Sequence, residues 1–236
     1  VAWLGNIPSH WGTKPLKHLV GNVVVTTDEK LEDDAYVALE NVEGWTGVVR
    51  PRMGTVEFDS QVKRFLSGDI LFGKLRPYLA KVARPTCNGV CVGEFLVLRA
   101  KGGAVDAQLL EMQLRSPGFI GLVSSSAYGA KMPRAEWQFI GNIPMPCPPH
   151  DSREREAVVG YLTSVDRAIR SAIRAKRRQI ELLNEQKQVF INRLVTRGLE
   201  PTVRLKPSGI GWLGEIPEHW NIVRIRSLAK LVTSGS

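Results

Sequence analysis

The chain has 236 residues and a formal net charge of +9, from 32 Lys and Arg side chains against 23 Asp and Glu. Hydrophobic residues make up 43%, which is enough for a folded core and excludes a disordered chain. Three cysteines exclude a disulfide-rich secreted scaffold and favour a reducing cytoplasm. No apolar run approaches the ~18 residues of a membrane span. The positive charge predicts an acidic partner, most often nucleic acid.

The charge is unevenly spread along the chain. Residues 1–150 carry a net charge of +2 and residues 151–236 a net charge of +7. Prolines are frequent up to Pro149 and absent from residue 151 to residue 200. This asymmetry predicts a domain boundary at Pro148-Pro149. We therefore expect a domain over 1–150, a long helix over 151–198, and a linker with the start of a second repeat over 199–236.

A nine-residue motif occurs twice. The sequence WLGNIPSHW at residues 3–11 returns as WLGEIPEHW at residues 212–220, at an offset of 209 residues. The offset is far longer than the ~20–50 residues of a solenoid repeat. We therefore expect a duplicated module of domain size, within a longer two-repeat architecture. We expect structural roles for His10 and His219 inside these motifs.

The middle of the chain predicts an α+β fold. Asn88-Gly89 predicts a hairpin between residues 81–83 and 90–92, and residues 94–98 predict a further strand. Residues 107–115 have helical spacing and end before Pro117. The fold class expected is one mixed α/β domain followed by a long coiled-coil helix.

Two segments of this domain carry candidate DNA contacts. If residues 73–79 are extended, Lys74, Arg76 and Tyr78 share one face, and Lys81 follows in the same segment. Basic groups around an aromatic ring suit phosphate contact and base stacking. A solvated edge strand explains the pattern equally well, because Pro77 favours an edge or a loop.

The second candidate segment follows a loop of small residues over 124–130. Lys131 and Arg134 flank Met132-Pro133, and such a loop can approach DNA closely. Arg134 can then donate two hydrogen bonds to a guanine edge. An ordinary surface loop is the alternative, and Lys63 and Arg64 are weaker candidates of the same kind.

The last third predicts one long helix. Apolar residues recur between 151 and 198 at steps of mostly three, four or seven. A helix of this length needs a partner, so we expect a coiled coil, antiparallel or formed with a second chain. A helix folded back on its own domain is the alternative. The expected dimerisation seam comprises Val158, Leu162, Val165, Ile169, Ile173, Ile180, Leu183, Phe190 and Leu194.

Four segments together resemble the specificity subunit of type I restriction-modification systems. They are the repeated motif, residues 68–82, residues 131–134 with 143–149, and the helix with LNEQK at 183–187 and VTRGL at 195–199. In that family, two target-recognition domains alternate with two long helices that pair antiparallel. Each domain reads one half of a bipartite double-stranded DNA site, and the helices set the spacing of the half-sites.

The resemblance implies a non-catalytic subunit. It implies docking of methyltransferase (modification) subunits and, through them, of a restriction subunit. This chain departs from the full pattern because it has one complete recognition domain and one long helix. Two forms fit: a truncated piece and a natural half-length subunit, which would pair as a homodimer on a symmetric site. Because the segment over residues 73–79 recurs across family specificities, the resemblance implies that it positions the DNA backbone rather than reads bases.

Five arginines form a basic stripe, which we expect beside the apolar seam at Ile169 and Ile173. A solvated coiled-coil flank is the usual explanation. No acidic residue occurs from 167 to 180, which favours contact with DNA phosphates or with an acidic face of the methyltransferase subunit. The stripe comprises Arg167, Arg170, Arg174, Arg177 and Arg178.

No catalytic residue, cofactor or metal is expected. The sequence has neither a Gly-rich phosphate loop nor a nucleophile elbow. Cys87, Cys91, Cys147 and His150 would in principle allow a zinc site, but family members usually carry apolar residues where the last two stand. The functional alternative is a coiled-coil assembly adaptor whose globular domain binds protein. An independent nuclease or methyltransferase is disfavoured by the missing motifs.

Overall fold

The computed structural model describes residues 3–54, 56, 60–102, 105–149, 153–200 and 202–228. The chain forms two compact units, residues 1–163 (the first unit) and residues 164–236 (the second unit). The first unit contains strands β1 to β10, helices α1 to α4 and the start of α5. The second unit contains the rest of α5 and three short elements.

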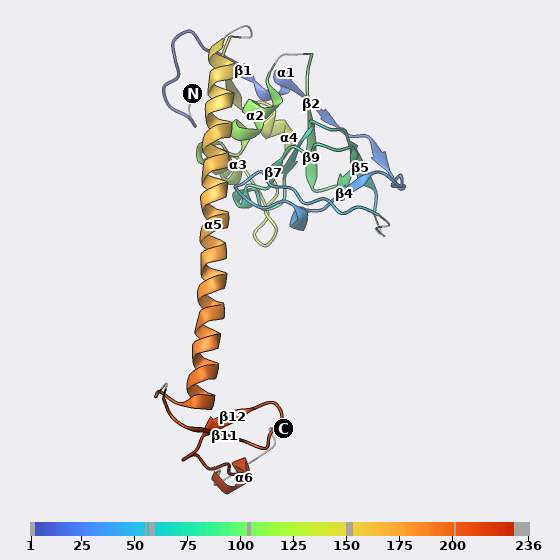
Figure 1. Ribbon diagram of the computed structural model, residues 1–236. Coiled ribbons are helices and arrows are strands. Elements are labelled where there is room, and N and C mark those ends of the chain that lie inside the picture. The colour runs from blue at the N-terminus through green and yellow to red at the C-terminus, as the bar shows by residue number, and fades with distance from the viewer. Residues whose placement is uncertain are drawn as a thin grey trace. The chain divides into compact units, whose positions relative to one another are not determined.

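Two four-stranded sheets build the first unit (Figure 1). One has the order β2-β9-β6-β7 and is antiparallel throughout. Its strands are β2 (Val20–Val23), β9 (Phe95–Ala100), β6 (Ile70–Gly73) and β7 (Val82–Ala83). The other has the order β3-β5-β8-β4 and is mixed, because β4 pairs with β8 in parallel. Its strands are β3 (Thr26–Thr27), β5 (Val62–Phe65), β8 (Gly89–Val92) and β4 (Ala35–Val37).

Neighbouring residues of β9 pack into two different cores. Leu96 and Leu98 belong to a core that also contains residues of helices α1 to α4. Phe95 and Val97 belong to a core with residues of β4 and β8. Because successive side chains of a strand point to opposite faces, both faces of this sheet are buried. Residues 95–98 of this strand are therefore a continuous apolar run rather than an alternating one.

Short helices cover one face of the first sheet. They are α1 (Leu16–Leu19), α2 (Ala107–Leu114), α3 (Pro117–Ser125) and α4 (Trp137–Ile140). Asp106 caps α2, because its carboxylate accepts hydrogen bonds from the backbone N–H of Gln108 and Leu109, each at 2.9 Å. The helix expected at 107–115 is present, and α3, which the sequence did not predict, follows directly with Pro117 in its first turn.

The predicted hairpin at Asn88-Gly89 is wrong. Strand β7 pairs with β6, whereas β8 pairs with β5 and β4, so the two arms do not meet. Gly89 is instead needed because a Cβ there would collide with the backbone of Ala35. A glycine in a strand pattern here marks the close approach of two strands, not a turn.

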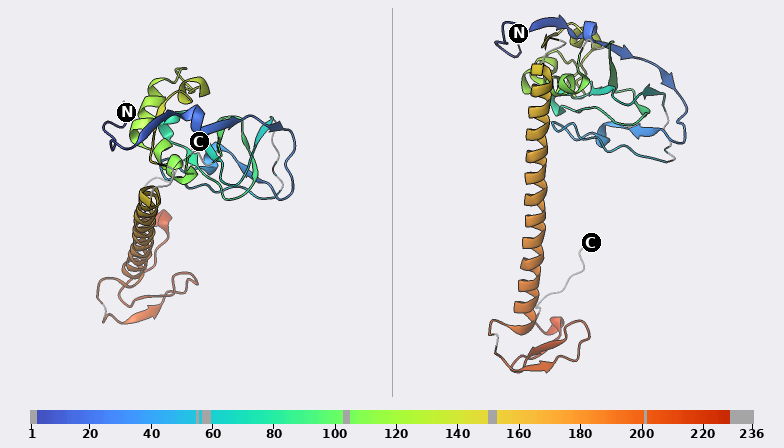
Figure 2. Two further views of the ribbon diagram at one scale, coloured as in Figure 1. Left: turned by 90° about the horizontal axis from the view of Figure 1, so that it is seen from above. Right: turned by 45° about the horizontal axis from the view of Figure 1, so that its top comes forward.

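Helix α5 (Arg153–Arg197) is continuous in every view (Figures 1 and 2). The predicted mixed α/β domain followed by a long helix is confirmed, and none of the side chains of α5 is fully buried. Gly198 follows with φ of 72°, the left-handed conformation of a helix C-terminal cap. In the second unit, β11 (Leu205–Pro207) pairs antiparallel with β12 (Glu215–Pro217), and α6 spans Ile225–Leu228.

Two shorter features complete the described chain. Strand β1 (Gly12–Pro15) pairs antiparallel with β10 (Pro144–Cys147), which joins the beginning of the first unit to its end. Among the helices that the structure describes, none has the length and apolar character that crossing a membrane requires.

Candidate nucleic-acid interface

The two segments predicted to contact DNA lie side by side. The backbone N–H of Arg76 donates to the carbonyl of Pro133 at 2.7 Å, and that of Ala135 donates to Lys74 at 3.0 Å. Arg134 also forms isolated β-bridges with Leu75 and Tyr128. These backbone bonds bring together two loops that are about 60 residues apart in the sequence, so their basic side chains form one candidate surface.

The prediction of an extended segment over residues 73–79 is wrong. Strand β6 ends at Gly73, Arg76 has φ of 49°, and Pro77–Leu79 forms a short 3-10 helix (η2) followed by Ala80 at φ of 47°. Proline disfavours a right-handed helical conformation in the residue before it, and the hydrogen bond to Pro133 holds Arg76 in the left-handed region. Lys74, Arg76 and Tyr78 therefore share a loop, not one face of a strand.

A polar pocket opens beside these loops. Lys63, Lys74 and Arg134 contribute its cationic side chains, and Tyr128 adds a ring that is 61% exposed. Burial, and next the charge of Lys74, lowers the pKa of the Lys63 ammonium. The Oδ1 atom of Asn22, also in this wall, is buried without a hydrogen-bond partner among the described residues. Glu136 also lines the pocket, so three cationic side chains and one carboxylate face it.

Arg134 is held by a carboxylate that the sequence did not single out. Its Nε lies 3.2 Å from both oxygens of Glu94, and its Nη2 donates to Oε1 at 2.9 Å. This pairing raises the pKa of the guanidinium, so Arg134 stays charged. Glu94 precedes Arg134 by 40 residues, and no local pattern in the sequence indicates that they meet.

The remaining candidates differ in where the structure places them. Arg76, Tyr78 and Lys131 are exposed on the two loops. Lys81 instead donates to the carbonyls of Leu39 and Val42 at 2.6 and 2.9 Å, so its ammonium holds a loop of the domain. We therefore remove Lys81 from the candidate surface. Arg64 donates to Asp34 at 2.8 Å and is committed in the same way.

The first copy of the repeated motif anchors the start of α5. His10 Nε2 lies 2.7 Å from Glu154 Oε2, and the indole N–H of Trp11 donates to Oε1 at 3.2 Å. The hydrogen bond from His10 lowers the pKa of the Glu154 carboxyl. Trp3 donates to the carbonyl of Pro144 at 2.9 Å and packs edge-to-face on Phe119. These contacts are structural, and a motif match alone could not name Glu154 as their partner.

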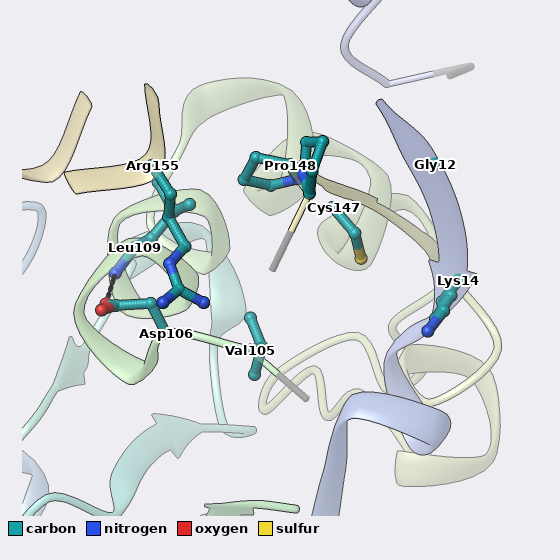
Figure 3. Close-up of a pocket in the computed structure, with 9 residues that line it drawn as sticks. Gly12, Lys14, Val105, Asp106, Leu109, Cys147, Pro148 and Arg155 are labelled. Carbon is teal, nitrogen blue, oxygen red and sulfur yellow. Dashed lines mark hydrogen bonds between the residues drawn. The ribbon is translucent and has the colours of Figure 1, made fainter. Parts of the chain in front are cut away.

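A second pocket lies next to this anchor. Figure 3 shows Lys14 of β1 and Arg155 of α5 on its two sides, with the carboxylate of Asp106 bonded to the α2 backbone. Cys147 lines the pocket, whereas Cys91, a residue of β8, is buried in the core. His150 lies outside the described residues, and those that are described contain no group of three potential metal ligands.

The basic stripe of α5 is only partly beside the apolar seam. At ~100° per residue, Arg170 and Arg177 lie roughly next to Ile173, whereas Arg167, Arg174 and Arg178 lie roughly on the opposite side of the helix. The expectation that all five flank the seam is therefore corrected. Arg170 pairs with Asp166 at 2.6 Å and Arg178 with Glu181 at 3.0 Å.

No protein-family model matches the chain. Among curated proteins, it is similar to the EcoDI type I restriction enzyme specificity subunit of Escherichia coli, with 24% identity over 179 residues, covering 72% of this chain and 39% of that protein. It is also similar to the MjaVIII type I restriction enzyme specificity subunit of Methanocaldococcus jannaschii, with 28% identity over 109 residues, covering 46% and 24%. The chain thus spans well under half the length of these relatives.

Solved structures share the fold. The HsdS subunit from Thermoanaerobacter tengcongensis matches with a TM-score of 0.56 and 19% identity, over 87% of this chain and 55% of that one. A chain from a study of complex assembly and conformational transition in the type I R-M system matches with a TM-score of 0.58 and 19% identity, over 86% and 55%.

Proposed function

We propose that the chain is a specificity subunit of a type I restriction enzyme and that it recognises a DNA sequence on behalf of a modification enzyme. The observation that carries the proposal is the meeting of loops 73–80 and 126–136 around one cationic pocket. In this proposal, residues 1–150 bind one half of a bipartite site in double-stranded DNA.

The weak net charge of that domain shapes the proposed mechanism. At +2 over residues 1–150, bulk attraction to DNA is small, so recognition rests on a few placed groups. Lys74, Arg76 and Lys131 would contact phosphates and fix the register of the loops on the duplex. Arg134 would read a guanine edge, and the exposed ring of Tyr78 or Tyr128 would pack against sugar or base.

The long helix supplies the proposed assembly. Its seam exposes large apolar side chains in the single chain, including Ile180 at 58% and Phe190 at 62%. Pairing with a second copy would bury them, in the manner of a coiled coil. Such a homodimer would place two identical recognition domains on a symmetric site.

The arginines opposite the seam would remain outside this pairing. Arg167 and Arg174 are exposed and would stay available to DNA phosphates or to an acidic face of a methyltransferase subunit, whereas Arg178 is exposed but paired with Glu181. We propose that the subunit is itself non-catalytic and acts in the cytoplasm. It would dock methyltransferase subunits directly and the restriction subunit through them.

The proposal is tested by selecting duplexes from a random-sequence pool with the full chain. We expect enrichment of a short sequence, and a binding constant for it that falls steeply as salt rises from 50 to 200 mM. Arg134→Ala should weaken binding to the enriched duplex by about tenfold and leave random duplexes nearly unchanged. An equal loss on both would make Arg134 a phosphate contact.

Two outcomes would contradict the proposal. Absence of any enriched sequence, together with weak salt dependence, would favour the protein-binding adaptor. Methyl transfer to DNA by the purified chain, without a partner subunit, would refute its non-catalytic role.

A further inference from the structure

A carboxylate stands in the middle of the proposed DNA surface. Glu94 lies in the turn between β8 and β9, and its side chain is 29% exposed. DNA carries a charge of the same sign, so an acid at this place weakens general attraction to the duplex. Its presence is explained if the carboxylate fixes the position of one of the cationic side chains around it.

Glu94 engages only one edge of the Arg134 guanidinium. Its carboxylate accepts hydrogen bonds from Nε and Nη2, which form one edge of the forked guanidinium group. Within the described residues, Nη1 makes no hydrogen bond, so the end of the fork formed by Nη1 and the outer hydrogen of Nη2 stays available. That end has the two parallel donors that match the O6 and N7 acceptors of guanine in the major groove.

The turn that carries Glu94 is itself held in place. The Lys63 ammonium donates to the carbonyls of Gly93 and Phe95, on either side of Glu94, at 3.2 and 2.8 Å. The carbonyl of Glu94 accepts from the backbone N–H of Lys74 at 2.9 Å. The backbone of this turn is therefore held at three carbonyls, so the position of the Glu94 side chain does not depend on Arg134 alone.

We propose that Glu94 is a positioning residue that determines specificity, by fixing Arg134 with its free end directed at a guanine. A fixed arginine loses less conformational freedom when it binds a base. The same carboxylate repels phosphates that would otherwise pair with Arg134, so the arginine discriminates between sequences rather than adding general affinity. The inference rests on the proposed function and assigns to Lys63 the task of holding the turn.

The test compares Glu94→Gln with the matched control Glu32→Gln, since each removes one negative charge and Glu32 is exposed outside the network. The probes are the duplex enriched by the wild-type chain and a random-sequence duplex, bound by the full chain. For Glu94→Gln we expect the affinity ratio between the two to fall about tenfold, with random-duplex affinity unchanged or higher. Glu32→Gln should keep the wild-type ratio, and thermal unfolding of each variant checks its fold.

A second measurement first tests the guanine contact of Arg134 with a modified duplex, without any variant of Glu94. Replacing single guanines of the enriched duplex by 7-deazaguanine removes the N7 acceptor while base pairing is kept. One such replacement should lower wild-type affinity about tenfold and have little effect on Arg134→Ala. In the Arg134→Ala background, Glu94→Gln should change the affinity ratio no further.

The outcomes separate the two claims. If Arg134→Ala loses discrimination but Glu94→Gln keeps the wild-type ratio, the positioning role is overturned and the proposed function stands. If Glu94→Gln lowers the ratio equally with and without Arg134, Glu94 does not act through Arg134 and the inference again fails. If the wild-type chain enriches no sequence, both fall together.

Discussion

At the scale of single residues, buried carboxylates tie distant parts of the first unit together. Asp69 is 3% exposed and accepts from the backbone N–H of Leu66 at 2.8 Å. It also receives both Nε and Nη2 of Arg99, at 2.8 and 2.7 Å, which joins the turn before β6 to strand β9. The hydrogen bonds from Arg99 to Asp69 raise the pKa of the guanidinium. This pair stabilises the sheet that carries the loops proposed to contact DNA.

Asp69→Ala should cost about 2–3 kcal/mol in the free energy of unfolding. The change leaves a backbone donor and a charged fork without their acceptor, and partial exposure of Arg99 limits the loss. Urea denaturation measures this loss in the free energy of unfolding. Glu40→Ala is the control, because its pair with Arg52 is long, at 3.6 Å, and more than half exposed on both sides. It should cost less than ~0.5 kcal/mol, and equal losses would contradict the assignment.

At the scale of secondary-structure elements, predictability depended on whether a pattern is local. Helix α5 could be predicted from its apolar spacing and lack of proline, because a helix is stabilised by neighbours along the chain. The pairing of β8 could not, since its partners β4 and β5 come from distant parts of the sequence. The hairpin prediction at Asn88-Gly89 was wrong for that reason. Asn88 accepts a hydrogen bond from the backbone N–H of Ser67, and the missing side chain of Gly89 allows β4 to approach closely.

The candidate site divides in the same way. Basic residues in two loops could be singled out from composition and spacing, but the bend at Arg76 and the use of Lys81 within the fold depend on tertiary partners. Glu94 could not be predicted from the sequence, because its contact with Arg134 forms only where two segments distant in sequence meet. The sites that local patterns missed are those made by contacts between segments distant in sequence.

The seam of α5 predicts a sharp effect of one side chain. Phe190→Lys should convert the proposed dimer to a monomer, because a charge in an apolar helix interface loses hydration without a partner. Asn192→Lys adds the same charge roughly on the opposite face and should leave the dimer intact. Light scattering during size-exclusion chromatography gives the mass of each. A wild-type monomer, or equal dissociation of both variants, would contradict pairing through this seam.

The anchor at the start of α5 predicts a pH dependence. The pKa of Glu154 lies below its ordinary value of 4.5 because His10 bonds the ionised form. The contribution of this contact to the stability of the fold is therefore present above pH 4.5, and it is lost as the pH falls through the lowered pKa of Glu154. The indole N–H signal of Trp11, which donates to Glu154, should report this transition in an NMR titration.

His10→Ala should move the midpoint of that titration to higher pH, toward the ordinary value for glutamate. The structure gives the reason, since removal of the imidazole takes away the strongest stabilisation of the carboxylate. An unchanged midpoint in the variant would mean that His10 does not set the pKa of Glu154.

At the scale of the whole molecule, the distribution of charge and the repeated motif indicate how recognition and assembly are divided along the chain. The domain over residues 1–150 is nearly neutral and the remainder carries most of the positive charge, which matches local readout by placed groups in one part and assembly in the other. The repeated motif bonds to the start of a long helix in its first copy and lies after the end of that helix in its second. We propose that this chain directs a modification enzyme to one DNA sequence.

Mapping of methylated bases in a host genome tests that claim most directly. A host without type I systems would produce the modification subunit alone, with this chain, or with its Arg134→Ala variant. We predict methylation at one bipartite, symmetric motif only when the wild-type chain is present, and strongly reduced methylation with the variant. Methylation of the same positions by the modification subunit alone would contradict the account.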